Sequence, residues 1–323
     1  MNIGAVVIGR NEGERIRRCL RSCEALGEQR VYVDSGSTDG SVQIAEAAGA
    51  AVVRLDMIRP FTAARARNAG ARELLQRFPT VKYIQFVDGD CEVLPNWLVT
   101  ASGFLDAHSE VVAVAGRRRE RHPEASIYNT LCDIEWDTPV GEAKAVGGDA
   151  LFRVDAFEAC DGYRESLISG EEPELCVRLR AHGGRVHRLG VDMTLHDAAM
   201  SRFSQWWKRT MRSGYAFAEG ASLHGASPER HFADETRRAL LWGVWLPLSI
   251  AALTTWRPEF AALLLAYPAQ WLRLGLRFSK ARGVVPWTHS ALLMLGRLPE
   301  AQGALKFYLG RLRGRGSRLI EYK

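Results

Sequence analysis

The stretch KYIQFVDGDCEV, residues 82–93, joins an apolar run to a pair of acids. β-branched and aromatic residues dominate the run, which predicts a buried strand ending at Val87. Asp88 and Asp90 would then lie at the carboxyl end of that strand, on a turn that Gly89 permits. Ligands of open α/β sheets bind at this end of the strands. Taken alone, the pair is more typical of an ordinary Asp-Gly-Asp turn, with a cation site as the alternative.

The composition is that of a globular protein with a cationic excess. The chain has 323 residues, of which 47% are hydrophobic, enough for more than one folding unit. Lysines and arginines outnumber acids by 43 to 37, which suits phosphorylated ligands or an anionic membrane. Six cysteines without a CxxC pair argue against a zinc ribbon or a disulfide framework and favour a reduced cytoplasm. The first apolar stretch is too short for a signal peptide, so we expect a strand there.

Short β-branched runs alternate with amphipathic stretches over the first 200 residues. Buried parallel strands are expected at 3–9, 30–35, 51–56, 83–88 and 111–116. Helices are expected at 14–26, 41–48, 62–77 and 96–107. This alternation predicts right-handed βαβ crossovers and an α/β fold with a mostly parallel sheet flanked by helices.

The chain becomes strongly apolar after about residue 237. Residues 239–256 and 260–272 contain no charged side chain. A helix that spans a bilayer takes ~20 apolar residues and at least about 17, so each run is at or below the shortest length that can span. The flanking cations are Arg237, Arg238, Arg273, Arg277, Lys280 and Arg282, and the possible interface anchors are Trp242, Trp245, Trp256 and Trp271. This pattern predicts membrane association through a tight or re-entrant hairpin or through interfacial helices. A buried helical hairpin is the alternative.

Other strand ends also carry polar side chains. VIGRNE ends the first strand and leaves Arg10, Asn11 and Glu12 at the ligand edge. VDSGSTDGS ends the second strand with Asp34, which would accept hydrogen bonds from a base or ribose. Asp39, in the following turn, is expected to cap the next helix.

A basic helix follows. PFTAARARNAGAREL places Arg65, Arg67 and Asn68 in the first turns, where cations and helix N–H groups meet a diphosphate. The sequence does not choose between the two arginines. A lone basic helix would more often be a solvated face.

Taken in order, these motifs resemble family 2 of the glycosyltransferases, which has the GT-A fold. The motifs are VVIGRNE, VDSGSTDGS, ARARNAG, VDGD, GGDALFR and GEEPELCVRLR, over residues 3 to about 200. The resemblance implies an inverting, hexosyltransferase-like transfer from a nucleotide diphosphate sugar with Mg²⁺ or Mn²⁺, and the C-terminal region indicates a membrane-associated bacterial type.

The resemblance also implies roles for individual residues. VDGD is similar to the family's Asp-x-Asp motif, so Asp90 would bind the metal and Asp88 the ribose or a coordinated water. In some relatives a histidine at the position of His196 completes the metal shell, so His196 would be a second metal ligand, with a structural histidine as the alternative. Asp34 is similar to the nucleoside-contacting acid, but the family often doubles that aspartate and this chain has Ser35, so the base that is bound stays open.

The acceptor side is implied by two further motifs. AVGGDALFR is similar to the glycine-rich segment beneath the acceptor site, where Gly147 and Gly148 would let backbone approach a sugar and Asp149 would bind a hydroxyl, with a plain loop as the alternative. Relatives carry Glu-Asp before the Leu-Cys-x-Arg helix, with the aspartate as base, and this chain has Glu171 and Glu172 there.

Glu172 is therefore the expected catalytic base. Pro173 marks a helix start, whose dipole favours an ionised carboxylate, and a free Glu has a pKa of ~4.3, so we expect Glu172 to be ionised at neutral pH. Glu171 is expected to cap the helix or to contact the acceptor.

Three parts follow from these features: a catalytic domain in 1–200, a basic aromatic connecting helix in 201–236, and a helical, membrane-associated region in 237–323. The order of residues in QWWKR does not support processive synthesis.

We expect a nucleotide sugar donor, a lipid-linked glycan or surface-glycan precursor as acceptor, a location at the cytoplasmic face of the inner (plasma) membrane, and no nucleic acid. A nucleotidyltransferase and a nucleotide-sugar-binding membrane protein without turnover are the alternatives. The nucleotide, the acceptor linkage and the oligomeric state stay open.

Overall fold

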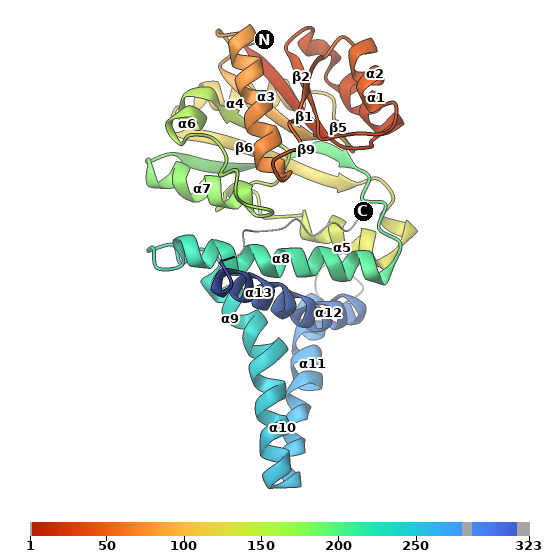
Figure 1. The fold of residues 1–323 in the computed structure, drawn as a ribbon, viewed down its shortest axis with the longest axis vertical. Helices are drawn as coiled ribbons and strands as arrows, with labels where there is room; N and C mark the ends of the chain where they lie inside the picture. Colours follow the sequence, from red (N-terminus) through yellow and green to blue (C-terminus); the bar gives the residue numbers. More distant parts are fainter. Residues whose placement is uncertain (1, 280–285, 315–323) are drawn as a thin grey trace. The chain divides into compact units, whose positions relative to one another are not determined.

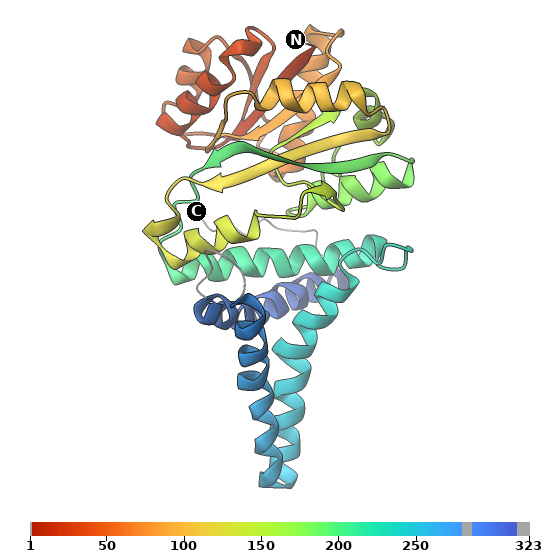
Figure 2. The same cartoon turned by 180° about the vertical axis from the view of Figure 1, so that it is seen from behind.

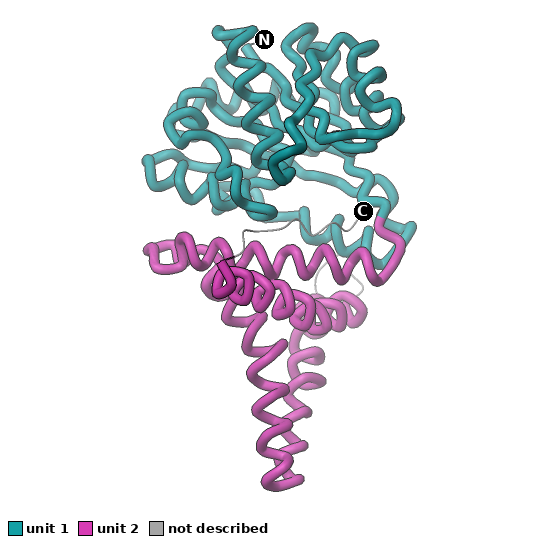
Figure 3. The backbone as a smooth tube through the Cα atoms, viewed as in Figure 1, with its two compact units in different colours: residues 1–199 teal, residues 200–323 magenta. Residues whose placement is uncertain are grey.

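The structure is a computed structural model that describes residues 2–279 and 286–314. It divides into two compact units, Met1–Ala199 and Met200–Lys323 (Figure 3). Two of the cations expected beside the apolar runs, Lys280 and Arg282, lie outside the described residues.

A nine-stranded sheet forms the first unit, in the order β3-β2-β1-β4-β8-β6-β9-β5 with β7 beside β9 (Figure 1). The strands are β1 (Ile3–Gly9), β2 (Arg30–Asp34), β3 (Ala51–Arg54), β4 (Tyr83–Asp88), β5 (Cys91–Val93), β6 (Val111–Glu120), β7 (Gly141–Glu142), β8 (Ala150–Arg153) and β9 (Arg185–His196). The pairings make β5, β7 and β8 antiparallel to the other strands. The predicted mostly parallel α/β sheet is confirmed.

Helices connect and cover these strands. They are α1 (Glu14–Ser22), α2 (Ser41–Ala47), α3 (Ala63–Arg77), α4 (Trp97–Ala107), α5 (Ile127–Glu135), α6 (Val154–Ala159) and α7 (Glu171–Ala181), with short 3₁₀ turns at η1 (Glu24–Leu26) and η2 (Pro123–Ala125). α1 and α2 connect strands that advance one way along the sheet, whereas α3 returns, so right-handed crossovers place α3 on the opposite face. A Cβ on Gly70 would lie 2.3 Å from Val6 Cγ1, so the close packing of α3 on β1 requires glycine there.

Polar residues collect at one edge of this sheet because parallel strands end there together. β2, β4, β6 and β9 end at Asp34, Asp88, Glu120 and His196. β8 runs in the opposite direction, so Asp149, which precedes it, lies at the same edge. The apolar core lies behind this edge, between the sheet and its helices.

The described part of the second unit is helical. Its elements are α8 (Phe203–His224), α9 (Ala233–Leu240), the π-helical η3 (Leu241–Trp245), α10 (Leu246–Trp256), the 3₁₀-helical η4 (Pro258–Leu265), α11 (Ala266–Phe278), α12 (Pro286–Leu295) and α13 (Arg297–Leu312). A Cβ on Gly214 of α8 would lie 2.0 Å from the Glu300 carbonyl oxygen, and one on Gly303 of α13 would lie 1.9 Å from that of Met211. The two helices therefore pack in direct backbone contact.

An apolar hairpin extends from this bundle (Figures 1 and 2). Residues Ala233–Trp256 form one helical run, and an 18-residue window within it has a mean hydropathy of 1.5, so the run is long and apolar enough to cross a membrane. η4 and α11 return beside it. Trp245, Trp256 and Leu265 are 61%, 72% and 67% exposed, so the hairpin presents large apolar side chains to its surroundings.

Candidate active site

Asp88, at the end of β4, lies between two arginines. Its Oδ1 accepts a hydrogen bond from Arg67 Nη2 at 2.8 Å, and its Oδ2 accepts one from Arg118 Nη2 at 2.9 Å. Burial opposes ionisation of Asp88, but the two guanidinium groups outweigh it and hold the pKa of the carboxyl below its usual value. Asp88 is therefore a charged, fixed group at the ligand edge.

Arg67, on α3, connects Asp88 to the start of α7. Its Nη1 donates to Glu171 Oε1 at 2.8 Å and lies 3.0 Å from Glu172 Oε1. The guanidinium also lies over the ring of Tyr163, 5.6 Å from its centroid. The Glu171 side chain is 4% exposed and that of Glu172 is 14% exposed, so Glu172 is the more accessible of the two carboxylates.

The protonation of Glu172 differs from the sequence-based expectation. Burial and the neighbouring Glu171 carboxylate raise the pKa of Glu172 to about 7, although Arg67 lowers it. The helix dipole is too weak to restore the ordinary value. Glu172 therefore keeps its proton to a higher pH than a free glutamate does.

The backbone before α7 fixes the orientation of both glutamates. Gly170 is the N-cap with φ of 81°, a left-handed conformation that favours glycine, and no side chain caps the helix. Glu171 and Glu172 both contact Arg67. Glu174, one turn on, is buried and pairs with Arg178 at 2.7 Å, which ties the helix to itself.

Asp149 supports this cluster from within the protein. Its Oδ1 accepts the Asp88 N–H at 2.9 Å, and its Oδ2 accepts bonds from Arg118 Nε at 2.9 Å and Thr194 Oγ1 at 2.7 Å. The Asp149 side chain is 0% exposed. It holds Asp88 and Arg118 in place, and an acceptor contact by Asp149 stays a prediction.

The glycines before Asp149 differ in their surroundings. A Cβ on Gly148 would lie 2.6 Å from Arg67 Nη2 and 2.7 Å from Asp88 Oδ2, so the backbone there approaches the ion pair directly. Gly147 is exposed, and a Cβ on it would meet no atom within 4 Å. Only Gly148 is restricted by packing.

Asp90 and His196 lie together, close to Cys91. Donor atoms of the three side chains all lie within 4.8 Å of one another. His196 Nε2 is 3.4 Å from Asp90 Oδ2, and His196 Nδ1 is 3.4 Å from Glu120 Oε2. Burial disfavours the imidazolium, but Asp90 and Glu120 outweigh it and raise the pKa of His196. Two carboxylates beside one imidazole therefore favour a positive charge at this position, whether on the imidazole or on a metal ion.

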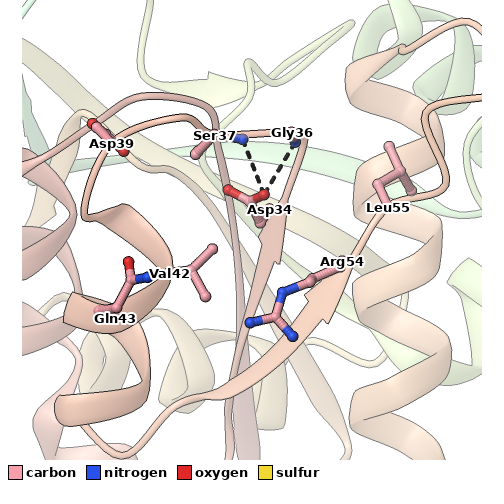
Figure 4. Close-up of a pocket in the computed structure, with 8 residues that line it drawn as sticks. All are labelled: Asp34, Gly36, Ser37, Asp39, Val42, Gln43, Arg54 and Leu55. Atoms are coloured by element: carbon pink, nitrogen blue, oxygen red, sulfur yellow. Dashed lines mark hydrogen bonds between the residues drawn. The ribbon is translucent and has the colours of Figure 1, made fainter.

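The end of β2 borders a cavity of about 390 Å³ (Figure 4). Its lining residues are Asp34, Gly36, Ser37, Asp39, Val42, Gln43, Arg54 and Leu55. Asp34 Oδ2 accepts the N–H groups of Gly36 and Ser37, both at 3.1 Å, and Asp34 Oδ1 accepts the hydroxyl of Tyr32 at 3.2 Å. Asp39 Oδ1 accepts the Ser41 N–H at 3.0 Å, at the start of α2. Asp34 therefore shapes the turn that borders the cavity.

Residues after β1 join this turn. Asn11 Oδ1 accepts the Thr38 N–H at 2.8 Å, and the Glu12 N–H donates to Ser41 Oγ at 3.0 Å. Arg10 is exposed beside them. The turns after β1 and β2 thus form one hydrogen-bonded surface.

The other two polar residues of α3 hold loops. The Arg65 guanidinium donates to the carbonyl oxygens of Asp56, Arg59 and Pro60. Asn68 forms two bonds with the Tyr163 backbone, donating to its carbonyl at 2.8 Å and accepting its N–H at 2.9 Å. Both side chains are buried. Donor contacts by Arg65 and Asn68 stay predictions.

Comparison with protein families agrees with this arrangement. Residues 5–160 match the sequence model described as glycosyl transferase family 2. This domain belongs to glycosyl transferase family 2. The glycosyltransferase fold that the motif order predicted is therefore confirmed.

A solved mannosyltransferase structure shares the fold of this chain, and a second solved structure is similar to part of it. A mannosyltransferase from Pyrobaculum calidifontis, in complex with GDP-Man and Mn²⁺, has a TM-score of 0.62 at 19% identity, covering 95% of this chain and 87% of its own. Glucosyl-3-phosphoglycerate synthase from Mycobacterium tuberculosis, in complex with Mn²⁺, UDP and glucosyl-3-phosphoglycerate, has a TM-score of 0.49 at 18% identity, covering 68% and 78%.

Two residues of the candidate site, Arg118 and Glu120, were not predicted from the sequence. Arg118 contacts both Asp88 and Asp149, and its guanidinium lies 5.4 Å from the Trp136 ring centroid. Glu120 contacts His196. Both belong to GRRRE at the end of β6, and charged residues directly after a β-branched run were the available signal.

Proposed function

We propose that this chain is a metal-dependent, inverting glycosyltransferase that moves a hexose from a nucleotide diphosphate sugar to an acceptor hydroxyl. The observation that carries the proposal is the position of Glu172. It is a partly exposed carboxylate with a pKa of about 7, held by Arg67 at the edge where Asp88 ends β4. A general base works best when its pKa lies near the working pH.

The residues suggest the following division of labour. Glu172 takes the proton of the acceptor hydroxyl as that oxygen attacks the anomeric carbon. The nucleoside diphosphate departs from the opposite face of the sugar, so the anomeric configuration inverts. Arg67 keeps Glu172 in place and balances part of its negative charge.

A divalent cation fits the donor set of Asp90 and His196. Carboxylates suit Mg²⁺ and Mn²⁺, and imidazole suits transition metals, so the mixed set favours Mn²⁺. When bound, the cation would neutralise negative charge on the departing diphosphate. The Mn²⁺ and GDP-Man in the similar mannosyltransferase structure support this assignment. The cavity beside Asp34 is our proposed nucleoside site.

The acceptor is proposed to be a lipid-linked glycan or surface-glycan precursor reached from the cytoplasmic face of the membrane. The apolar hairpin supports this, because Arg238 and Arg257 bound an uncharged run of 18 residues. A helix of that length rises about 27 Å, close to the ~30 Å hydrocarbon core of a bilayer. Trp256 stacks on Phe260 at the turn, where paired aromatic rings suit a membrane interface.

Release of nucleoside diphosphate tests the proposal. Purified full-length protein is incubated with a panel of UDP, GDP and dTDP sugars and Mn²⁺ or Mg²⁺, with and without a membrane lipid extract. We expect release from one nucleotide class that requires metal and increases with the extract. Chelation should abolish it.

The two alternatives give different products. A nucleotidyltransferase would release pyrophosphate from a nucleoside triphosphate. A binding protein without turnover would bind the nucleotide sugar, as measured by calorimetry, and release no diphosphate with any acceptor.

A further inference from the structure

Glu120 is a buried acid beside the candidate metal donors. It is the last residue of β6 and pairs in register with His196, the last residue of β9. Its side chain is 0% exposed. Burial of a carboxylate is costly unless hydrogen bonds compensate for lost water, so the contacts of Glu120 indicate why it is there.

Three N–H donors and the His196 ring surround the Glu120 carboxylate. Oε1 accepts from the His122 N–H at 3.2 Å and from Asn129 Nδ2 at 3.3 Å. Oε2 accepts from the Ala198 N–H at 3.1 Å and faces His196 Nδ1 at 3.4 Å. Two backbone N–H groups and one side-chain amide therefore fix the carboxylate beside the imidazole.

This contact determines which nitrogen of His196 is left for a ligand. An ionised carboxylate only accepts hydrogen bonds, so Nδ1 must carry a proton to bond Glu120. The neutral imidazole then has its lone pair on Nε2, which faces Asp90 Oδ2 at 3.4 Å. Trp136 packs edge-on against the imidazole, with ring centroids 4.7 Å apart, and restricts its rotation.

We propose that Glu120 is a positioning residue of the metal centre: it holds His196 in the tautomer and ring orientation in which Nε2 and the Asp90 carboxylate bind one divalent cation. A carboxylate that orients a ligating histidine also raises its basicity, and loss of such a partner costs 10- to 100-fold in metal affinity. The inference rests on the metal-dependent function proposed above.

The test is the affinity for Mn²⁺, measured from the loss of the free-ion signal in electron paramagnetic resonance. Full-length protein in detergent is titrated with Mn²⁺ alone and then with Mn²⁺ and a nucleoside diphosphate. Glu120→Gln keeps the size of the side chain but removes its charge. We expect it to weaken Mn²⁺ binding about 10- to 100-fold.

A double-mutant cycle separates positioning from general damage. If Glu120 acts through His196, adding Glu120→Gln to His196→Ala should weaken Mn²⁺ binding no further. Glu174→Gln is the matched control, because Glu174 is another buried glutamate of the same unit, paired with arginines away from these donors. It should lower thermal stability and leave the Mn²⁺ affinity unchanged.

Three results would overturn the inference or its basis. Wild-type Mn²⁺ affinity in folded Glu120→Gln, or effects of Glu120→Gln and His196→Ala that add, would overturn the role of Glu120 alone. No Mn²⁺ binding by the wild type, with or without nucleotide, would overturn the metal-dependent function itself. If Glu120→Gln does not fold, Glu120→Asp serves instead, since it keeps the charge but withdraws it by one methylene, and an unchanged affinity there would count against the proposal.

Discussion

Arg67 Nη1 lies 3.0 Å from Glu172 Oε1 and thereby joins the proposed base to the end of β4, since the same guanidinium donates to Asp88. Glu171 shares the same Nη1 at 2.8 Å. One cation thus serves three carboxylates. Burial and the neighbouring Glu171 carboxylate raise the proton affinity of Glu172, Arg67 offsets them only in part, and several predictions depend on this balance.

Substitution of the base should separate binding from transfer. We expect Glu172→Gln to keep donor binding, measured by calorimetry, and to lower transfer about 100-fold or more, because a lost general base costs ~10²–10⁴ in rate. Glu171→Gln is the neighbouring control and should lose far less. Near-normal transfer by Glu172→Gln with collapse in Glu171→Gln would show that the base is Glu171.

The rate should depend on pH near neutrality. A base must be unprotonated, so kcat/KM should rise as the pH rises through about 7, the pKa of Glu172. The Glu171 charge contributes to that high value. Glu171→Gln should therefore move the acid limb of the pH profile to lower pH. An unmoved limb would assign the titration to another group.

The contribution of Glu172 to folding stability should fall over the pH range in which kcat/KM rises. Because the folded-state pKa of Glu172 is raised from 4.5 to about 7, folding favours the protonated form. The stability from this group is fully present below about pH 4.5 and is lost as the pH rises through about 7. Glu172→Gln should thus raise the melting temperature at about pH 8 and change it little near pH 4.5, as measured by scanning fluorimetry. A lower melting temperature at both pH values would contradict this.

Loss of a metal donor should affect turnover more than folding. Asp90 lies in the turn between β4 and β5, outside the paired strands, so we expect Asp90→Asn to abolish metal-dependent donor turnover and to keep the circular dichroism spectrum of the wild type. Diphosphate release and spectra are measured on the same sample. Wild-type turnover would remove Asp90 from the metal site.

Charge in the apolar hairpin should release the protein from lipid. Leu248 and Leu264 are 60% and 51% exposed on its two arms. Asp at the centre of a membrane helix costs about 2.5–3.5 kcal/mol, so Leu248→Asp with Leu264→Asp should greatly reduce flotation with anionic vesicles. Val99→Asp, at a 62% exposed position of α4, is the control and should float like the wild type. A wild type that stays in the soluble fraction without detergent and binds no vesicles would refute membrane attachment.

The order of motifs along the chain was sufficient to predict the fold and one edge of the site. Parallel strands end at a common edge, so acids directly after β-branched runs must meet there. Asp34 and Asp88 are such residues, and Glu172 was identified from the resemblance of GEEPELCVRLR to the family's motif. These signals are local, because each depends on a few adjacent residues.

Charged residues at the end of β6 were not recognised in this way. GRRRE has the sequence of a solvated strand end, yet Arg118 pairs with Asp88 and Glu120 lies beside His196 in the candidate site. Their partners lie 30 and 76 positions away, at Asp88 and His196. Only strand pairing and register bring such positions together.

The two arginines of α3 show the same division between sequence and tertiary structure. A helix rotates about 100° per residue, so Arg65 and Arg67 must point to different sides, and the sequence establishes that much. Which side faces the site depends on how α3 packs on β1 and β2. In the structure Arg65 binds the carbonyls of the loop before the helix, and Arg67 binds Asp88 and Glu172. The raised pKa of Glu172 has the same origin, because burial and neighbouring charge arise only when the chain has folded.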